Sequence, residues 1–158
     1  MILWRIATET RKYRADDLSG TGAALSPGRW NDAGQAVLYT APTIAIAVLE
    51  TAAHVDDAGL PLNRYLVKID LPDAAWAARQ VLDVVTLPLT WAAIPAGSAS
   101  VLIGADWFRA RVSPVLEVPS VIVPEETAAI INPGHPLVTG MTAEIVRLFE
   151  YNRLFRSG

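Results

Sequence analysis

The amino-acid sequence predicts an α+β fold. Apolar and polar residues alternate over 64–70, which is typical of a strand with one buried face. The apolar run that follows Pro42 and Thr43 predicts a helix, with Thr43 as its N-cap. Most other apolar runs are short, β-branched and separated by prolines, and most of them lie in the second half of the chain. With 158 residues, the chain is expected to form a single domain spanning residues 1–158.

The first half of the chain is expected to hold three strands and one well-defined helix. In order, they are a strand at 2–7, a loop at 8–27 with one turn of helix, a strand at 36–40, a helix that starts at 42–43 and ends before Gly59, and a strand at 64–70. Glycine and proline mark most of the boundaries between these segments.

The second half is expected to be richer in strands. In order, the sequence predicts a short helix or turn at 73–79, a strand at 81–85, a helix capped by Ser98 and running to about 111, short strands at 115–118, 120–123 and 129–131, and a last segment at 143–149. The spacing in 143–149 also permits a helix, but its β-branched and aromatic content favours a strand.

The composition excludes several classes of function. The chain has no cysteine and two histidines, His54 and His135, which argues against a metal site. Its net charge of −3 disfavours direct binding to nucleic acid, although Arg5, Arg11, Lys12 and Arg14 form a local basic group. No signal peptide and no apolar run long enough for a bilayer are expected, so we expect a cytoplasmic protein with no membrane contact.

Glu50 is the most informative residue, because it is a carboxylate within an otherwise apolar helix. A buried charge is costly unless it is paired, hydrogen-bonded or functional. Beside an arginine, such a carboxylate suits stabilisation of a developing positive charge, for example on a sugar. The alternative is a structural glutamate that bonds His54 or a distant arginine.

Arg29, Trp30 and Tyr39 lie shortly before Glu50 in the sequence. Arg29 follows Gly28, which allows a close backbone approach, and its guanidinium suits a phosphate or carboxylate. The alternative is that Arg29 is a surface residue or a partner of Asp32. Trp30 and Tyr39 are each explained as core residues or as platforms for a planar ring.

Three more candidates lie in the second half. Ser120 follows Pro119 and is typical of a turn or of the start of a strand. Asn132 and His135 belong to a segment with turn composition, 132–136, in which His135 is a loop residue that can face a ligand. The chain contains no dinucleotide fingerprint, phosphate-binding loop or nucleophile elbow.

Two ordered sets of motifs resemble the RES domain. The first comprises 28–31, Gly34, 37–41 and 45–50, and the second comprises 118–126 and 131–136. The resemblance extends from about Trp4 to Phe155. The family is named for an arginine, a glutamate and a serine, and Arg29, Glu50 and Ser120 occupy the matching motifs.

The resemblance implies a fold like that of ADP-ribosyltransferases and diphtheria-type toxins, with a central split β-sheet flanked by helices. It implies a toxin of a bacterial type II toxin–antitoxin pair that breaks the nicotinamide–ribose bond of NAD⁺. NAD⁺ is then a substrate, and no cofactor is expected. The implied partner is an Xre-like, helix-turn-helix antitoxin, which we expect to cover the cleft that holds Arg29 and Glu50.

The resemblance also implies roles for the candidate residues. Glu50 stabilises the ribosyl cation, Arg29 grips the pyrophosphate or nicotinamide ribose, and Tyr39 packs on the nicotinamide. The expected substrate-binding residues are Arg5, Trp30, Ser120, Asn132 and His135.

We expect an NAD⁺ glycohydrolase or phosphorylase that depletes NAD⁺ and arrests growth. One alternative is an ADP-ribosyltransferase that modifies a specific protein target. A second is a non-catalytic binding module in which an Arg–Glu pair is structural.

Overall fold

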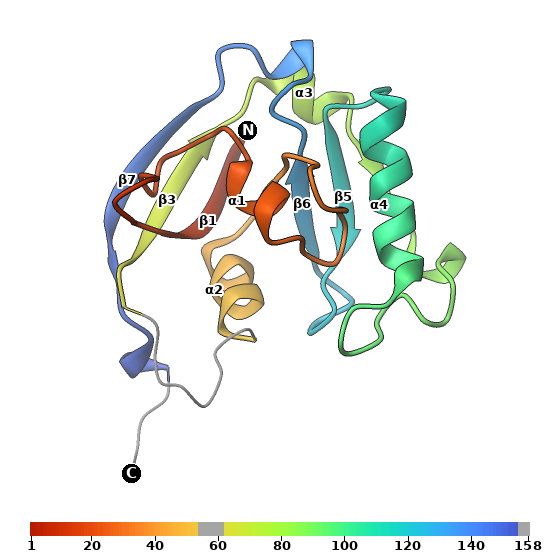
Figure 1. Cartoon of the computed structure of the whole chain (residues 1–158), viewed down its shortest axis with the longest axis horizontal. Helices are drawn as coiled ribbons and strands as arrows, with labels where there is room; N and C mark the ends of the chain where they lie inside the picture. The colour runs from red at the N-terminus through yellow and green to blue at the C-terminus, as the bar shows by residue number, and fades with distance from the viewer. Residues whose placement is uncertain (54–61, 155–158) are drawn as a thin grey trace.

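The computed structural model describes residues 1–53 and 62–154, and these residues form two β-sheets with helices around them (Figure 1). The predicted α+β class is confirmed, and two separate sheets agree with the expected split sheet. His54, one of the expected partners of Glu50, lies outside the described residues.

The first sheet, sheet A, is antiparallel and has the strand order β1-β3-β7. Its strands are β1 (Ile2–Thr8), β3 (Arg64–Asp70) and β7 (Thr142–Phe149). All three were predicted, including the strand that was favoured over a helix near the C-terminus. The central strand β3 buries Leu66, Val67 and Ile69, so it contributes to packing on both sides of the sheet.

The second sheet, sheet B, has the order β2-β6-β5-β4. Its strands are β2 (Leu38–Thr40), β6 (Thr127–Ile131), β5 (Val115–Pro119) and β4 (Gln80–Val81). The pairs β2–β6 and β6–β5 are antiparallel, whereas β4 runs parallel to β5. A bridge between Trp4 and Ala41 joins the two sheets.

Four α-helices and three 3₁₀ turns complete the described fold. They are α1 (Thr21–Leu25), α2 (Ile44–Ala52), α3 (Asp73–Ala77), α4 (Ser98–Ala110), η1 (Val84–Thr86), η2 (Pro136–Val138) and η3 (Tyr151–Arg153). The predicted cap of α2 is confirmed, because the Thr43 hydroxyl accepts a hydrogen bond from the Ile46 amide at 3.2 Å.

The core lies between the two sheets and beneath the helices. Leu3 and Val67 of sheet A share one buried cluster with Leu38 and Ile131 of sheet B. Helix α4 packs on sheet B through a second cluster that contains Trp107. Gly104 makes this packing possible, because a Cβ there would lie 1.9 Å from the Trp30 carbonyl oxygen.

Three predicted boundaries were wrong, each for a local reason. The strand expected at 81–85 ends at Val81, because the Asp83 carboxylate accepts from the Val85 amide and starts η1. The strand expected at 120–123 is a turn, whose amides bond the Ser120 hydroxyl instead of a neighbouring strand. Ser98 is the first helical residue of α4, and its N-cap is Gly97.

Helix α2 is also less buried than its composition suggests. Its three buried residues, Ile46, Ala47 and Val48, are consecutive and lie in the middle of the helix. Ile44 remains 37% exposed, and Glu50 is half-buried instead of fully buried. The carboxylate therefore lies at the boundary between core and solvent.

Candidate functional site

Three segments leave sheet B at the same end (Figure 1). Strand β5 runs toward Ser120, and β4, which is parallel to it, leads into residues 82–97. Strand β2 is antiparallel to β6 and therefore ends on the same side, where the chain enters α2. The topology thus brings the segments that carry Glu50, Ser120 and the contacts of Arg29 to one end of the sheet, which we call the Ser120 end.

Ser120 holds the carboxylate of Glu50. Its hydroxyl donates to Glu50 Oε1 at 2.5 Å, the short distance expected of a hydrogen bond to a charged acceptor. The Ser120 hydroxyl oxygen also accepts from the amides of Ile122 and Val123 at 3.2 and 3.1 Å. Because both acceptor positions of the hydroxyl are occupied, its single proton is directed at Glu50. The turn that replaced the expected strand therefore orients the carboxylate.

Arg29 is held by the backbone of a distant loop. Its Nη1 donates to the carbonyl oxygens of Trp91 and Ala93, both at 2.9 Å. Within the described part of the chain, Arg29 forms no ion pair with a carboxylate, so the alternative that it is a partner of Asp32 is wrong. Its Nε and Nη2 remain available for an anionic ligand.

Trp30 belongs to the core, which is one of the two roles that the sequence suggested for it. It is 3% exposed and stacks on Trp91, with the ring centroids 6.1 Å apart. This stack holds the segment that supplies the two carbonyl groups to Arg29. Trp30 thus supports Arg29 through packing.

Tyr39 fixes the loop that carries Arg29. Its hydroxyl accepts from the Trp30 amide at 3.0 Å and donates to Asn31 Oδ1 at 2.8 Å. Burial raises the pKa of Tyr39 well above its usual range, so the phenol stays protonated and keeps donating. Gly28 packs directly against this ring, since a Cβ at Gly28 would lie 2.6 Å from the phenol oxygen.

Asn31 is a site residue that the sequence reasoning missed. It is fully buried, and its Oδ1 accepts from both the Gly28 amide and the Tyr39 hydroxyl. Its Nδ2 donates to the carbonyl oxygens of Ala23 and Gln35. An asparagine directly after the Gly-Arg-Trp motif was the available signal, because asparagine often bonds loop backbone in this way.

Arg5 lies on the side of β1 that also carries the buried residues Leu3 and Ala7. Its Nη1 donates to the Asp17 carbonyl oxygen at 3.3 Å. Burial lowers the pKa of Arg5, and the charge of Asp17 acts in the opposite direction. The structure thus gives Arg5 a local partner, and its expected contact with NAD⁺ stays a prediction.

Asn132 and His135 lie at the other end of sheet B from Ser120. The Ser120 amide bonds the Glu126 carbonyl, whereas the Asn132 amide bonds the Pro114 carbonyl. The chain from 126 to 132 is extended, so these ends are roughly 20 Å apart. The structure therefore does not bring Asn132 and His135 together with the Glu50–Ser120 pair.

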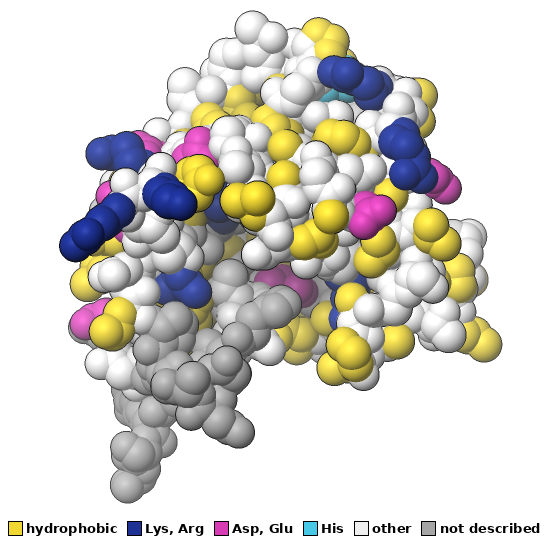
Figure 2. All heavy atoms as spheres, viewed as in Figure 1, with side chains coloured by type: hydrophobic (Ala, Val, Ile, Leu, Met, Phe, Trp, Pro, Cys, Tyr) yellow, Lys and Arg dark blue, Asp and Glu magenta, His cyan; other side chains and the backbone are white. Residues whose placement is uncertain are grey.

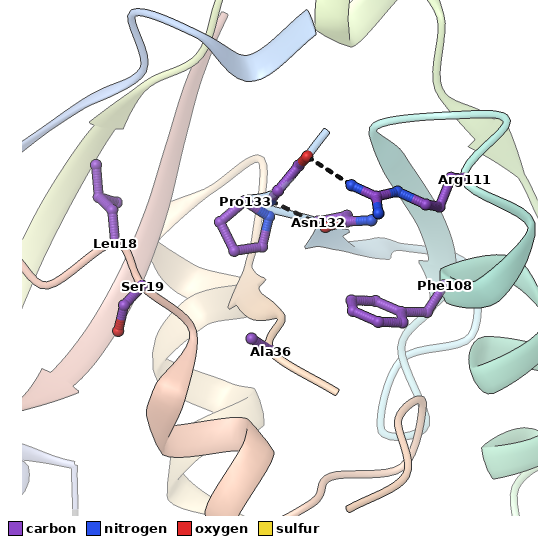
Figure 3. A pocket seen from close by; sticks show the side chains of 8 residues that line it. Leu18, Ser19, Ala36, Phe108, Arg111, Asn132 and Pro133 are labelled. Carbon is purple, nitrogen blue, oxygen red and sulfur yellow. Dashed lines mark hydrogen bonds between the residues drawn. The ribbon is translucent and has the colours of Figure 1, made fainter. Parts of the chain in front are cut away.

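A pocket of about 380 Å³ lies at this far end (Figure 3). It is lined by Leu18, Ser19, Ala36, Phe108, Arg111, Asn132, Pro133 and Gly134. Two polar side chains there bond the same turn: Asn132 Oδ1 accepts from the Gly134 amide, and Arg111, 23 residues earlier in the chain, donates to the Gly134 carbonyl. Likewise, His135 Nδ1 accepts from the Leu137 amide at the start of η2.

The described residues 1–53 and 62–154 contain no group of three or more histidine, aspartate or glutamate side chains placed to hold a metal ion. Over the same residues, no helix has the length and apolar character needed to cross a membrane. Lys and Arg side chains are scattered over the face in Figure 2 and are interspersed with acidic ones.

The geometry defines an α+β domain with a serine-oriented glutamate and a backbone-anchored arginine at one end of a split sheet. The family model described as the RES domain matches residues 2–152, and the chain belongs to this family. The structure thus brings Glu50, Ser120 and the loop that binds Arg29 to the same end of sheet B.

Three relatives support this assignment. The chain is 50% identical over 149 residues to the Prs ADP-ribosylating toxin of Sphingobium sp. (strain YBL2), covering 94% of this chain and 92% of that protein. It is 40% identical to a protein named Toxin Res from Photorhabdus laumondii, covering 84% and 82% of the two chains. A Toxin Res from Yersinia enterocolitica is 35% identical, with 85% and 86% covered.

Proposed function

We propose that this chain is the toxin of a toxin–antitoxin pair, and that it breaks the nicotinamide–ribose bond of NAD⁺. The observation that carries the proposal is the Glu50 carboxylate, which Ser120 orients at 2.5 Å at the edge of the solvent. The names of the relatives, which describe toxins and an ADP-ribosylating enzyme, support the same activity.

The chemistry requires little beyond charge stabilisation. The C1–N bond breaks with its electron pair moving into the pyridinium ring, so nicotinamide leaves neutral and needs no general acid. Positive charge develops on the ribose, where a fixed carboxylate lowers the barrier. Ser120 keeps the Glu50 oxygen in place without a reorganisation step, and Arg29 supplies free donors for the pyrophosphate.

We propose a protein side chain as the acceptor of ADP-ribose, because the Sphingobium relative is named for ADP-ribosylating Prs. Transfer to water or phosphate is the second candidate, since Glu50 is partly exposed and small acceptors can approach it. In either case we propose a cytoplasmic enzyme whose Xre-like antitoxin covers the Ser120 end and so keeps NAD⁺ intact.

Nicotinamide release from NAD⁺ tests the proposal directly. The Glu50→Gln variant should lose roughly 10²–10³-fold in turnover, the range seen when a transition-state charge loses its partner. Glu117→Gln is the matched control: this half-buried glutamate bonds Arg79 and Thr127 in sheet B, so its loss should lower stability and leave turnover unchanged. A wild-type protein that releases no nicotinamide, or a fully active Glu50→Gln variant, would overturn the proposal.

Products distinguish the acceptors. With labelled NAD⁺ and purified Sphingobium Prs, transfer places the label on the protein. Hydrolysis gives free ADP-ribose instead, and transfer to phosphate gives a soluble product that forms only when phosphate is present. If the label stays in solution with Prs present, the protein-acceptor proposal is wrong and the second candidate takes its place.

A further inference from the structure

Residues 84–105 form a stretch of the chain without a charged side chain, bounded by Asp83 and Asp106. Its first part, residues 84–97, which we call the apolar loop, carries three large aliphatic side chains that point into solvent. Val85 and Ile94 are 85% and 86% exposed, and Leu89 is fully exposed. Hydrophobic side chains gather at the lower right of Figure 2, over the segments below α4. Exposed apolar groups clustered in this way mark interaction surfaces.

The apolar loop is anchored to the rest of the protein. Trp91 is 7% exposed and stacks on Trp30 in the cluster beneath α4, and Leu87 packs against the same cluster. On the other side, the carbonyl groups of Trp91 and Ala93 accept from Arg29. Because Trp91 is already buried, the loop holds its exposed aliphatic side chains outward. A surface fixed in advance binds a partner with a smaller loss of conformational entropy.

The apolar loop also borders the candidate site. Its two carbonyl groups hold the guanidinium that is proposed to grip NAD⁺, and it leaves sheet B at the Ser120 end. A partner on this loop would therefore lie beside the ribose. Since the loop has no charges, apolar burial and not ion pairing would supply the contact energy.

We propose that the apolar loop is the docking surface for the protein acceptor of ADP-ribose. This proposal rests on the transferase reading of the proposed function. For transfer, the nucleophilic atom of the acceptor must bond ribose C1 as the C1–N bond breaks, nicotinamide leaves with the electron pair, and the acceptor's proton passes to the Glu50 carboxylate and then to water. A folded acceptor must rest on the surface around the site to reach C1, and this loop is an apolar part of the surface at the Ser120 end.

Charge substitutions on the loop separate docking from bond cleavage. Leu89→Asp and Val85→Asp change exposed side chains that are not adjacent to the carbonyl groups of Trp91 and Ala93, so both variants should fold normally. Labelling of purified Sphingobium Prs should fall at least tenfold in kcat/KM. Nicotinamide release measured without Prs should stay within twofold of wild type. Val112→Asp is the control, because Val112 is 81% exposed but precedes β5 at the far end of sheet B.

Each other outcome has a distinct meaning. Unchanged Prs labelling by Leu89→Asp overturns the docking proposal and leaves the antitoxin as the occupant of the loop. An equal loss of Prs labelling in Val112→Asp would overturn the proposal, because the effect would not be local to the loop. An equal loss of nicotinamide release in the loop variants would also overturn it, because the loop would then act on bond cleavage and not on docking. A wild-type dimer that becomes a monomer in Leu89→Asp would assign the loop to a second copy of the chain. Wild-type protein without nicotinamide release would instead overturn the proposed function.

Discussion

The two ends of sheet B differ in what their polar side chains do. At the Ser120 end, polar groups connect segments far apart in sequence: Ser120 bonds Glu50 of α2, and Arg29 bonds the loop at 91–93. At the far end, Asn132 and His135 bond amides two residues away. The far end nevertheless has the pocket. Long-range orientation of a charged group is therefore a better guide to chemistry in this fold than a hollow in the surface.

Two serines at opposite ends of β5 give the sharpest test of this contrast. Ser120→Ala removes the donor that fixes Glu50, so kcat for nicotinamide release should fall about 100-fold, as expected when a catalytic group loses its position. Its other bonds are to amides of a partly exposed turn, so stability should fall by only about 1 kcal/mol.

Ser113→Ala is the matched control at the far end. The Ser113 hydroxyl accepts from Trp107 Nε1 at 2.8 Å within the core, and its loss leaves a buried donor unpaired. We expect a loss of about 1–3 kcal/mol in the free energy of unfolding and unchanged kcat. Denaturant unfolding and nicotinamide assays measure both quantities; a Ser113 variant that loses turnover as Ser120→Ala does would remove the contrast.

Two arginines provide a second pair. Arg29 and Arg111 each donate to backbone carbonyl groups, but only Arg29 is at the Ser120 end. Arg29→Lys replaces a planar fork by a single ammonium, which cannot bond the loop carbonyls and a pyrophosphate together. KM for NAD⁺ should rise roughly tenfold, with a smaller change in kcat.

Arg111→Lys should leave KM unchanged, because Arg111 contributes to the cap of α4 and to the turn at Gly134. Steady-state kinetics measure KM and kcat for NAD⁺ in both variants. Equal increases in KM would show that NAD⁺ contacts both ends of the sheet.

The sequence was sufficient to predict most helices and strands, but not the hydrogen bonds that side chains form between segments. Alternation placed β3 at its observed bounds, and Thr43 marked the start of α2, because both signals are local. The Ser120 turn was missed, since a β-branched run has the composition of a strand whether or not a hydroxyl bonds its amides. Asn31 was missed although its five bonds reach residues no more than eight positions away, because the composition of a loop does not show which polar side chain turns inward to bond its backbone.

The same distinction explains the treatment of Glu50. Composition indicated a carboxylate within an apolar helix, and the structure places Glu50 on α2. The degree of burial was overestimated, because only the middle of α2, residues 46–48, is buried and the helix becomes half-buried from Leu49 onward. The hydroxyl that orients Glu50 comes from a residue 70 positions away, and no local pattern predicts such a partner.

The smallest effect is expected at Asn132, the residue that the sequence assigned to substrate and the structure assigns to a turn. Asn132→Ala removes the acceptor of the Gly134 amide, a neutral hydrogen bond worth about 1 kcal/mol to the turn. Roughly 20 Å of extended chain separates Asn132 from the Ser120 end. KM and kcat for NAD⁺ should therefore each change less than about threefold.

His135→Ala tests the same region without affecting that turn bond, since its Nδ1 accepts from Leu137. If both variants raised KM for NAD⁺ tenfold while unfolding like wild type, the dinucleotide would extend along β6 into the pocket, and the two ends of the sheet would form one site.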